Sequence, residues 1–179
     1  ADKTDPSAIP GPLRKTVLGV VAKHADAATW DAIHVQAQAE KTPLIRNQLY
    51  TLLAAAEDES LAKKALALAL TTEPGETLSS TMISKVAQSH PDMTFDWAVA
   101  NKDAVNDKVD SSSRTRFIPG LGAGSSNPAT ADKIKAYAAA NLAEGSRKEA
   151  DKAAAAVVNR AKIRQLRLPA ITAWVAKAG

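Results

Sequence analysis

Apolar residues recur at every third or fourth position along most of this chain, and that spacing constrains its fold more than any other feature. The clearest row runs through Ile45, Leu49, Leu52, Leu53 and Ala56, as expected for one face of an amphipathic helix. Alanine, the best helix former, is the commonest residue, whereas aromatic residues, which favour strands, make up only 4% of the chain. The sequence therefore predicts an all-α protein.

Prolines and capping residues indicate where helices begin. Thr42-Pro43 and Asn127-Pro128 each place a capping side chain before a proline at the first helical position. The expected helices begin at Pro12 and then span about 27–40, 42–56, 58–71, 77–89, 91–104, a short stretch ending near Gly120, 128–142, 146–166 and a last short stretch after Leu168-Pro169. Because the connections are short, consecutive helices should pack side by side. We expect a HEAT-like α-α superhelix of antiparallel helix pairs.

Length and composition predict one domain. The prolines and glycine of residues 1–11 indicate a leading loop, and residues 12–179 form a single helical domain of ample size for a hydrophobic core. The absence of cysteine excludes disulfides, cysteine zinc sites and thiol nucleophiles. No apolar run approaches the roughly 18 residues of a membrane helix, so no membrane partner is expected. The start at Ala1, without methionine, suggests a processed or excised piece.

Catalytic motifs are not found, and we expect neither catalytic nor metal-ligating residues in this chain. The three histidines, His24, His34 and His90, are never four residues apart, as a helical zinc-hydrolase motif requires. Residues 122–126 are glycine-rich but match neither a nucleophile elbow nor a phosphate-binding loop. We interpret them as a flexible connection between helices.

The basic residues bear on what the chain could bind and not on catalysis. Residues 145–179 contain eight Lys or Arg against two Asp or Glu, but no interleaved aromatic residues that would stack on bases. A solvated face with cations at helix C-termini is the favoured interpretation, and nucleic-acid binding is disfavoured. Arg114 and Arg116 lie beside the breaker-rich region, where an arginine near a helix end can clamp a carboxylate.

The positions of the three tryptophans predict where the core lies. Trp30, Trp97 and Trp174 all fall on apolar rows of the expected helices. We therefore expect them to anchor the core, with a role at a domain interface as the alternative.

Several short stretches, taken in order, carry a family resemblance. They are residues 12–18, 44–56 with 58–62, 95–101, 116–121, 134–138, 146–147 and 171–175. In this order and spacing they resemble the C-terminal helical domain of zinc aminopeptidases of the aminopeptidase N and endoplasmic-reticulum aminopeptidase kind. The resemblance extends from about residue 12 to the end of the chain.

The resemblance implies that this chain is not itself an enzyme. In that family the zinc ligands and the residues that bind the substrate amine belong to an earlier domain, so zinc is expected there and no cofactor here. The chain would be the non-catalytic lid that covers the catalytic domain, limits access to peptides and excludes water on closing. Its partners would be that catalytic domain and the peptide, with Arg114 and Arg116 as candidate substrate-side residues.

Two other functions fit the same composition. One is an independent HEAT-like scaffold that binds a protein or peptide on its concave face. The other is a HEAT-like nucleic-acid binder, suggested by the sequence pI of about 9.3, which would require a basic concave surface and salt-sensitive retention on DNA.

Overall fold

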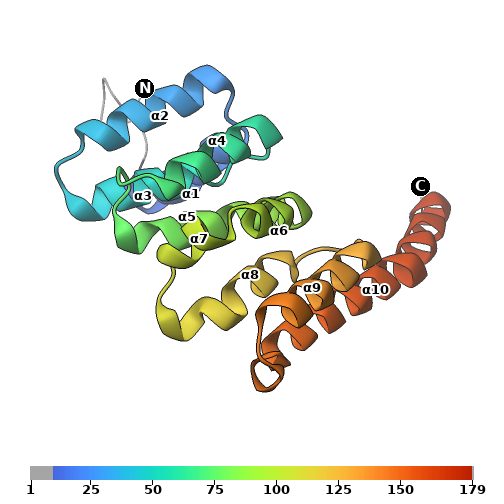
Figure 1. The fold of residues 1–179 in the computed structure, drawn as a ribbon. Helices are drawn as coiled ribbons and strands as arrows, with labels where there is room; N and C mark the ends of the chain where they lie inside the picture. The colour runs from blue at the N-terminus through green and yellow to red at the C-terminus, as the bar shows by residue number, and fades with distance from the viewer. Residues whose placement is uncertain (1–9, 179) are drawn as a thin grey trace. The chain divides into compact units, whose positions relative to one another are not determined.

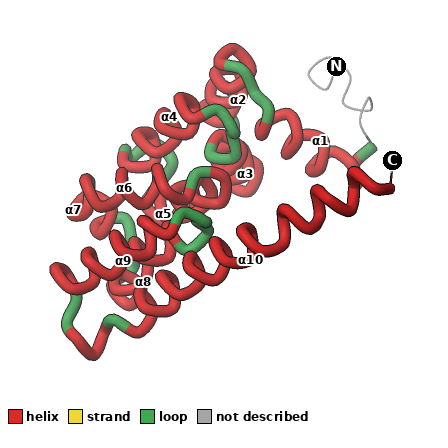
Figure 2. The backbone as a smooth tube through the Cα atoms, turned by 90° about the vertical axis from the view of Figure 1, so that its right-hand side faces the viewer, coloured by secondary structure: helices red, strands yellow, loops and turns green. Residues whose placement is uncertain are grey.

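The computed structural model describes residues 10–178. Within them it has helices joined by short loops and no β-strand (Figures 1 and 2). The α-helices are α1 (Gly11–Lys23), α2 (Ala27–Ala39), α3 (Pro43–Leu53), α4 (Glu59–Leu70), α5 (Glu76–Ser89), α6 (Pro91–Ala100), α7 (Lys102–Asp107), α8 (Arg114–Gly122), α9 (Pro128–Asn141) and α10 (Lys148–Ala178). Two 3₁₀ turns, η1 (Ser111–Ser113) and η2 (Glu144–Ser146), precede α8 and α10. The all-α prediction is confirmed.

The chain divides into two compact units, Ala1–Ser89 and His90–Gly179. Within each unit, helices pack mainly against near neighbours in the sequence, as pairs of an α-α superhelix would. The expectation of a single domain over 12–179 stays a prediction. Of the expected leading loop, residues 1–9 lie outside the described part of the chain, and α1 already begins at Gly11.

In the first unit, α3 lies at the centre of the packing. It contacts α1, α2, α4 and α5, and its buried residues Tyr50 and Leu53 are 1% and 0% exposed. Trp30 of α2 is 1% exposed and donates its indole N–H to the carbonyl oxygen of Leu53 over 3.0 Å. This bond satisfies the one polar group of a large buried ring, so Trp30 is the core anchor that the sequence predicts.

A polar cluster ties the α4–α5 connection to α2 and α3. A Glu73 Oε1 oxygen lies 2.6 Å from His34 Nε2 and accepts a 2.9 Å hydrogen bond from the Tyr50 hydroxyl. Burial alone would raise the pKa of Glu73, but hydrogen bonds from His34 and Tyr50 outweigh it and hold the pKa below its usual range. Burial, and then the hydrogen bond to Glu73, raises the pKa of Tyr50 to about 12. Gly75, with φ of 91°, completes the turn between α4 and α5.

In the second unit, α8 is the central helix and packs against α6, α9 and α10. Its core includes Phe95, Ile118 and Ile134, each 0–2% exposed. A Cβ atom added to Gly122 would lie 3.0 Å from Ile134 Cδ1 and 3.3 Å from Phe95 Cδ2. The glycine therefore permits a close approach of three helices.

The glycine-rich residues 122–126 connect α8 to α9, as predicted, but contacts from α10 hold this connection in place. Helix α8 extends through Gly122, and Ser125 is 1% exposed. Arg160 of α10 donates to the carbonyl oxygen of Ala123 over 2.5 Å, and Arg164 donates to Ser126 Oγ over 2.8 Å. Glycine-rich sequence indicates freedom of the unfolded backbone, but here arginine contacts from a distant helix hold the segment in place.

The expected break before the last helix is also wrong, since α10 runs continuously through Pro169. Proline removes one backbone hydrogen bond, to the carbonyl of Gln165. Residues 162–177 are all exposed, so water can bond that carbonyl. Helix α6 likewise ends at Ala100 rather than reaching Ala104, which belongs to α7.

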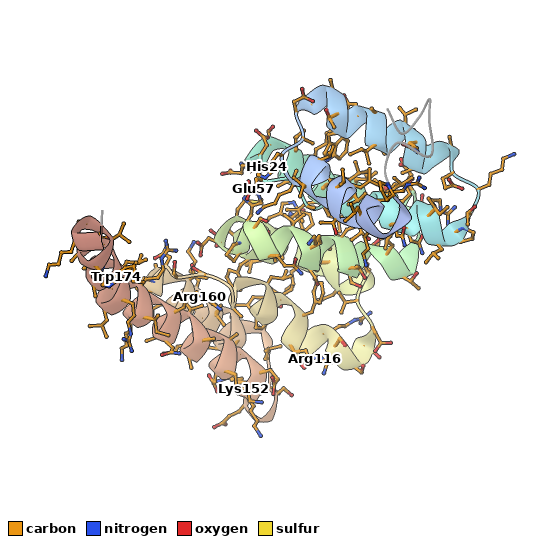
Figure 3. All side chains as sticks on the ribbon, turned by 180° about the vertical axis from the view of Figure 1, so that it is seen from behind. His24, Glu57, Arg116, Lys152, Arg160 and Trp174 are labelled. Atoms are coloured by element: carbon orange, nitrogen blue, oxygen red, sulfur yellow. The ribbon has the colours of Figure 1, made fainter. Side chains whose placement is uncertain are left out.

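Trp174 does not anchor the core, contrary to the prediction. It lies on the distal part of α10 (Figure 3) and is 70% exposed. Trp97, by contrast, is partly buried. An apolar row in the sequence indicates which face of a helix could be covered, but not that another element reaches it. In the second unit, burial on α10 stops at Ala161.

Glu73→Gln should destabilise the chain at neutral pH. A carboxylate with a lowered folded-state pKa contributes stability above its unfolded pKa, and the contribution disappears as pH falls through the folded value. Allowing for its partial exposure, we expect a loss of about 1 kcal/mol in unfolding free energy at pH 7. Urea unfolding at pH 7 and pH 3.5 measures the loss, which should shrink at the lower pH. Glu59→Gln, which breaks an exposed ion pair with Lys63, is the control, and an equal loss there would contradict the prediction.

Gly122→Val should destabilise the second unit. Overfilling a tightly packed contact costs about 1–3 kcal/mol. Gly120→Val is the matched control, because a Cβ at Gly120 would meet nothing within 4 Å. Thermal unfolding of both variants tests the contact, and similar melting temperatures would show that Gly122 is not a packing constraint.

Candidate functional site

Arg114 occupies the start of α8, where a cap and a 3₁₀ turn fix the backbone. The Asp110 side chain accepts hydrogen bonds from the Ser112 backbone N–H at 2.9 Å and from the Ser112 hydroxyl at 2.6 Å. These bonds lower the pKa of Asp110 below its ordinary value. Arg114 Nε donates to the carbonyl oxygen of Val109 over 3.2 Å. This bond ties the Arg114 side chain to the preceding turn.

A cavity of about 310 Å³ lies beside Arg114. It is formed by α7, the first turn of α8 and the C-terminal end of α9. Its lining residues are Lys102, Asp103, Asn106, Arg114, Thr115, Tyr137, Asn141 and Leu142. We call it the Arg114 pocket. All three elements belong to the second unit.

Hydrogen bonds hold one wall of the Arg114 pocket in place. Lys102 Nζ donates to Asn141 Oδ1 over 3.0 Å, and Asn141 Nδ2 donates to the carbonyl oxygen of Tyr137 over 2.9 Å. The ammonium group is therefore positioned across two helices. Such a fixed cation loses less side-chain entropy on binding a ligand than a free surface lysine does.

The pocket also contains an unsatisfied acceptor. Asn106 Oδ1 is buried and has no hydrogen-bond partner among the residues that the structure describes. A buried acceptor without a partner is costly. Pro119 has no N–H to donate to the carbonyl of Thr115 one turn earlier, and Thr115 lines the same pocket. A ligand that carries N–H groups would satisfy such acceptors.

The charges around the pocket favour an anionic group. Lys102 and Arg114 contribute two positive charges, and Asp103 contributes one negative charge 4.0 Å from Lys102 Nζ. Burial, and then the charge of Asp103, raises the pKa of Tyr137, so its phenol stays protonated at neutral pH. The pocket thus combines two cations, a phenol and an amide acceptor. This set can bind a carboxylate next to an amide.

The structure separates Arg116 from Arg114. Residues two apart on a helix do not face each other, and Arg116 is absent from the lining of the Arg114 pocket. Its guanidinium Nη2 donates to Ser113 Oγ over 2.9 Å on an exposed surface (Figure 3). Only one of the two predicted substrate-side arginines therefore reaches a cavity.

The histidines lie at three separate places. His24 Nδ1 is 3.2 Å from Glu57 Oε2 (Figure 3), His34 contacts Glu73, and His90 is the N-cap of α6. Within residues 10–178, no group of three or more His, Asp or Glu side chains could hold a metal ion. The residues present therefore do not fit the zinc ion that the family resemblance implies for the parent enzyme.

Two basic residues of α10 and the turn before it bond to helix C-termini. Arg147 Nε donates to the carbonyl oxygen of Leu142 over 3.0 Å, and Arg160 bonds to Ala123 after α8. Lys152 pairs with Glu149 at 2.7 Å. These contacts agree with the favoured interpretation of cations at helix C-termini.

Sequence analysis missed Lys102, Asn106, Tyr137 and Asn141. Each pair, Lys102 with Asn106 and Tyr137 with Asn141, has the i,i+4 spacing that places two side chains on one helix face. That spacing could have marked two polar faces. It could not show that the faces meet beside Arg114, because the two residue pairs lie at least 31 positions apart in the sequence.

A second, open cavity of about 470 Å³ follows α9 and α10 and is lined mainly by Lys135, Asp151, Asn159 and Lys162. No helix within residues 10–178 combines the length and the hydropathy that crossing a bilayer requires.

Comparison with known proteins identifies the family. The sequence matches the family described as "ERAP1-like C-terminal domain" over residues 1–159. No curated protein matches the chain at a significant level. Because the match spans well over half of the 179 residues, the chain belongs to the ERAP1-like C-terminal domain family and is part of a protein of the aminopeptidase family.

Proposed function

We propose that this chain is the non-catalytic lid of a zinc metalloaminopeptidase that trims N-terminal residues from peptides. The observation that carries the proposal is the family membership over residues 1–159. Zinc and the reacting residues would belong to the catalytic domain of the same polypeptide, which is the expected partner. The positions of His24, His34 and His90 support this division, because within residues 10–178 they lie apart and form no common ligand set.

The Arg114 pocket is the proposed point of contact with the peptide. A peptide substrate carries carboxylates and amide N–H groups, which match Lys102 and Arg114 on one side and the Asn106 acceptor on the other. Arg116 receives no contact in this proposal, because it lies outside the pocket. Holding the remote part of a peptide would position its N-terminus for cleavage elsewhere, which lowers the entropic part of the barrier.

Closure of the lid would supply the second part of the function. Covering a catalytic domain excludes water and restricts entry to chains that thread into the enclosed space. A HEAT-like stack suits this role because its helix pairs form an extended surface without contributing reacting groups. The alternative function is an independent scaffold. The exposed apolar residues of α10 favour a scaffold that binds protein.

Arg114→Ala in the full-length enzyme should raise KM for peptide substrates roughly tenfold. A charge-assisted hydrogen bond contributes about 1.5–3 kcal/mol, and 1.4 kcal/mol corresponds to a factor of ten. Hydrolysis of a single-residue anilide, which cannot reach the pocket, should be unchanged. Steady-state kinetics on both substrates measure the difference. Lys152→Ala, an exposed cation outside the pocket, is the control; equal losses in both variants would argue against a peptide contact at Arg114.

The isolated 179-residue chain should neither retain zinc nor cleave aminoacyl anilides. Elemental analysis after zinc loading and dialysis tests the first statement, and an anilide assay with and without chelator tests the second. Stoichiometric zinc, or hydrolysis that a chelator abolishes, would place the chemistry in this chain and overturn the proposed function.

A further inference from the structure

The C-terminal half of α10 extends beyond the elements that cover its first half. Helix α10 packs against α8 and α9, and its buried residues end at Ala161, which is 7% exposed. Every residue from 162 to 177 is exposed. Figures 1 and 3 show this half of the helix continuing past α8 and α9, with Trp174 near its end. This segment also lies outside the family match, which stops at residue 159.

One row of helix positions runs from the covered half into the uncovered half and is apolar except at Arg164. In the covered half it consists of Ala150, Ala154, Val157 and Ala161, which are 0–7% exposed. The same alternation of three- and four-residue steps continues through Arg164, Leu168, Ile171 and Val175. This is the a/d spacing with which helices pack along a seam. We call Leu168, Ile171 and Val175 the distal row.

The distal row is exposed to a degree that is unusual for large apolar side chains. Leu168, Ile171 and Val175 are 47%, 54% and 56% exposed, and neighbouring Trp174 is 70% exposed. Scattered apolar residues on a surface need no explanation, but a contiguous group marks an interaction site. The distal row is continuous with an interface that already packs helix against helix.

The charge of the segment restricts what can cover the row. Residues 162–178 contain Lys162, Arg164, Arg167 and Lys177 and no acidic residue. Arg164 already bonds to Ser126 Oγ, whereas Arg167 occupies a position that flanks the row. Basic residues beside an apolar seam select a partner with acidic residues at the facing positions.

We propose that the distal row binds an amphipathic helix of another protein, one that has acidic residues beside its apolar stripe. The continuous seam indicates a helix as the occupant, and the charge indicates an acidic one. A second copy of this chain is disfavoured because its own basic segment would repel. A membrane surface is disfavoured because Arg164 and Arg167 lie on the apolar side of the helix, whereas interfacial helices carry their cations on the polar face. This inference does not depend on the proposed function.

A designed peptide tests the proposal directly. The probe has three heptads, with Leu at positions a and d, Glu at e and g, and a fluorescein label. Its binding to the 179-residue chain, followed by fluorescence anisotropy, should saturate in the micromolar range. Binding should weaken at least tenfold between 50 and 500 mM NaCl. The same peptide with Lys at e and g should not bind.

Two variants of α10 test whether peptide binding depends on the distal row or on another face of the helix. Ile171→Asp should weaken binding of the acidic peptide at least tenfold. Leu166→Asp adds the same charge five residues away on a different face of the helix, where the side chain is 74% exposed, and should change binding less than threefold. Circular dichroism of both variants confirms that helix content is retained.

Three results would overturn the proposal. The first is failure of the acidic peptide to bind, and the second is an equal loss of binding in both variants. The third is a different occupant. Binding to phosphatidylcholine vesicles containing 30% phosphatidylglycerol, with a blue shift lost in Trp174→Phe, would identify a membrane surface. Dimers in analytical ultracentrifugation that dissociate in Ile171→Asp would identify a second copy.

Discussion

Close approach of helices through alanine and glycine is the constraint on which both units depend. Ala62, Ala65 and Ala69 of α4 are 0% exposed, and Gly122 has no room for a Cβ atom without moving its neighbours. Most of these helices have 9–14 residues, a length that is marginal for an isolated helix in water. Tertiary contacts therefore hold them, and small side chains let those contacts form at short distance. The polar contacts, such as Trp30 with Leu53, complete this packing by satisfying groups that it buries.

The sequence predicted helix starts well because they depend on local chemistry. Pro43, Pro91 and Pro128 each begin a helix as expected, since proline has a fixed φ and no donor to lose at that position. It was harder to predict where helices end and which of their faces are buried by other helices. Pro169 was expected to break α10 and Trp174 to be buried, but both outcomes depend on whether another element reaches that part of the helix. Periodicity identifies a face, and only the tertiary arrangement determines what covers it.

In the candidate site, too, local sequence singled out one residue, whereas the residues that distant segments bring beside it could not be predicted. Arg114 could be singled out because an arginine at a helix start beside a breaker-rich stretch has a local chemical meaning. Lys102 and Asn141 could not be paired with it, because their 3.0 Å contact joins α7 to α9 across 39 residues of sequence. The same limit explains why Arg116 was predicted together with Arg114, since the sequence contexts of the two arginines are similar. A difference of two positions along the helix separates an arginine that lines the pocket from one that lies on the exposed surface.

The two halves of α10 differ in side-chain size along one row, and this difference bears on what the distal half can bind. The covered half, which packs against α8 and α9, has alanine at three of its four row positions, the fourth being Val157. The distal row has Leu168, Ile171 and Val175 at the equivalent positions. Larger residues at a and d hold helices farther apart and need partner side chains to fill the gaps between them. The distal half thus fits a partner helix that brings large apolar side chains of its own to fill those gaps.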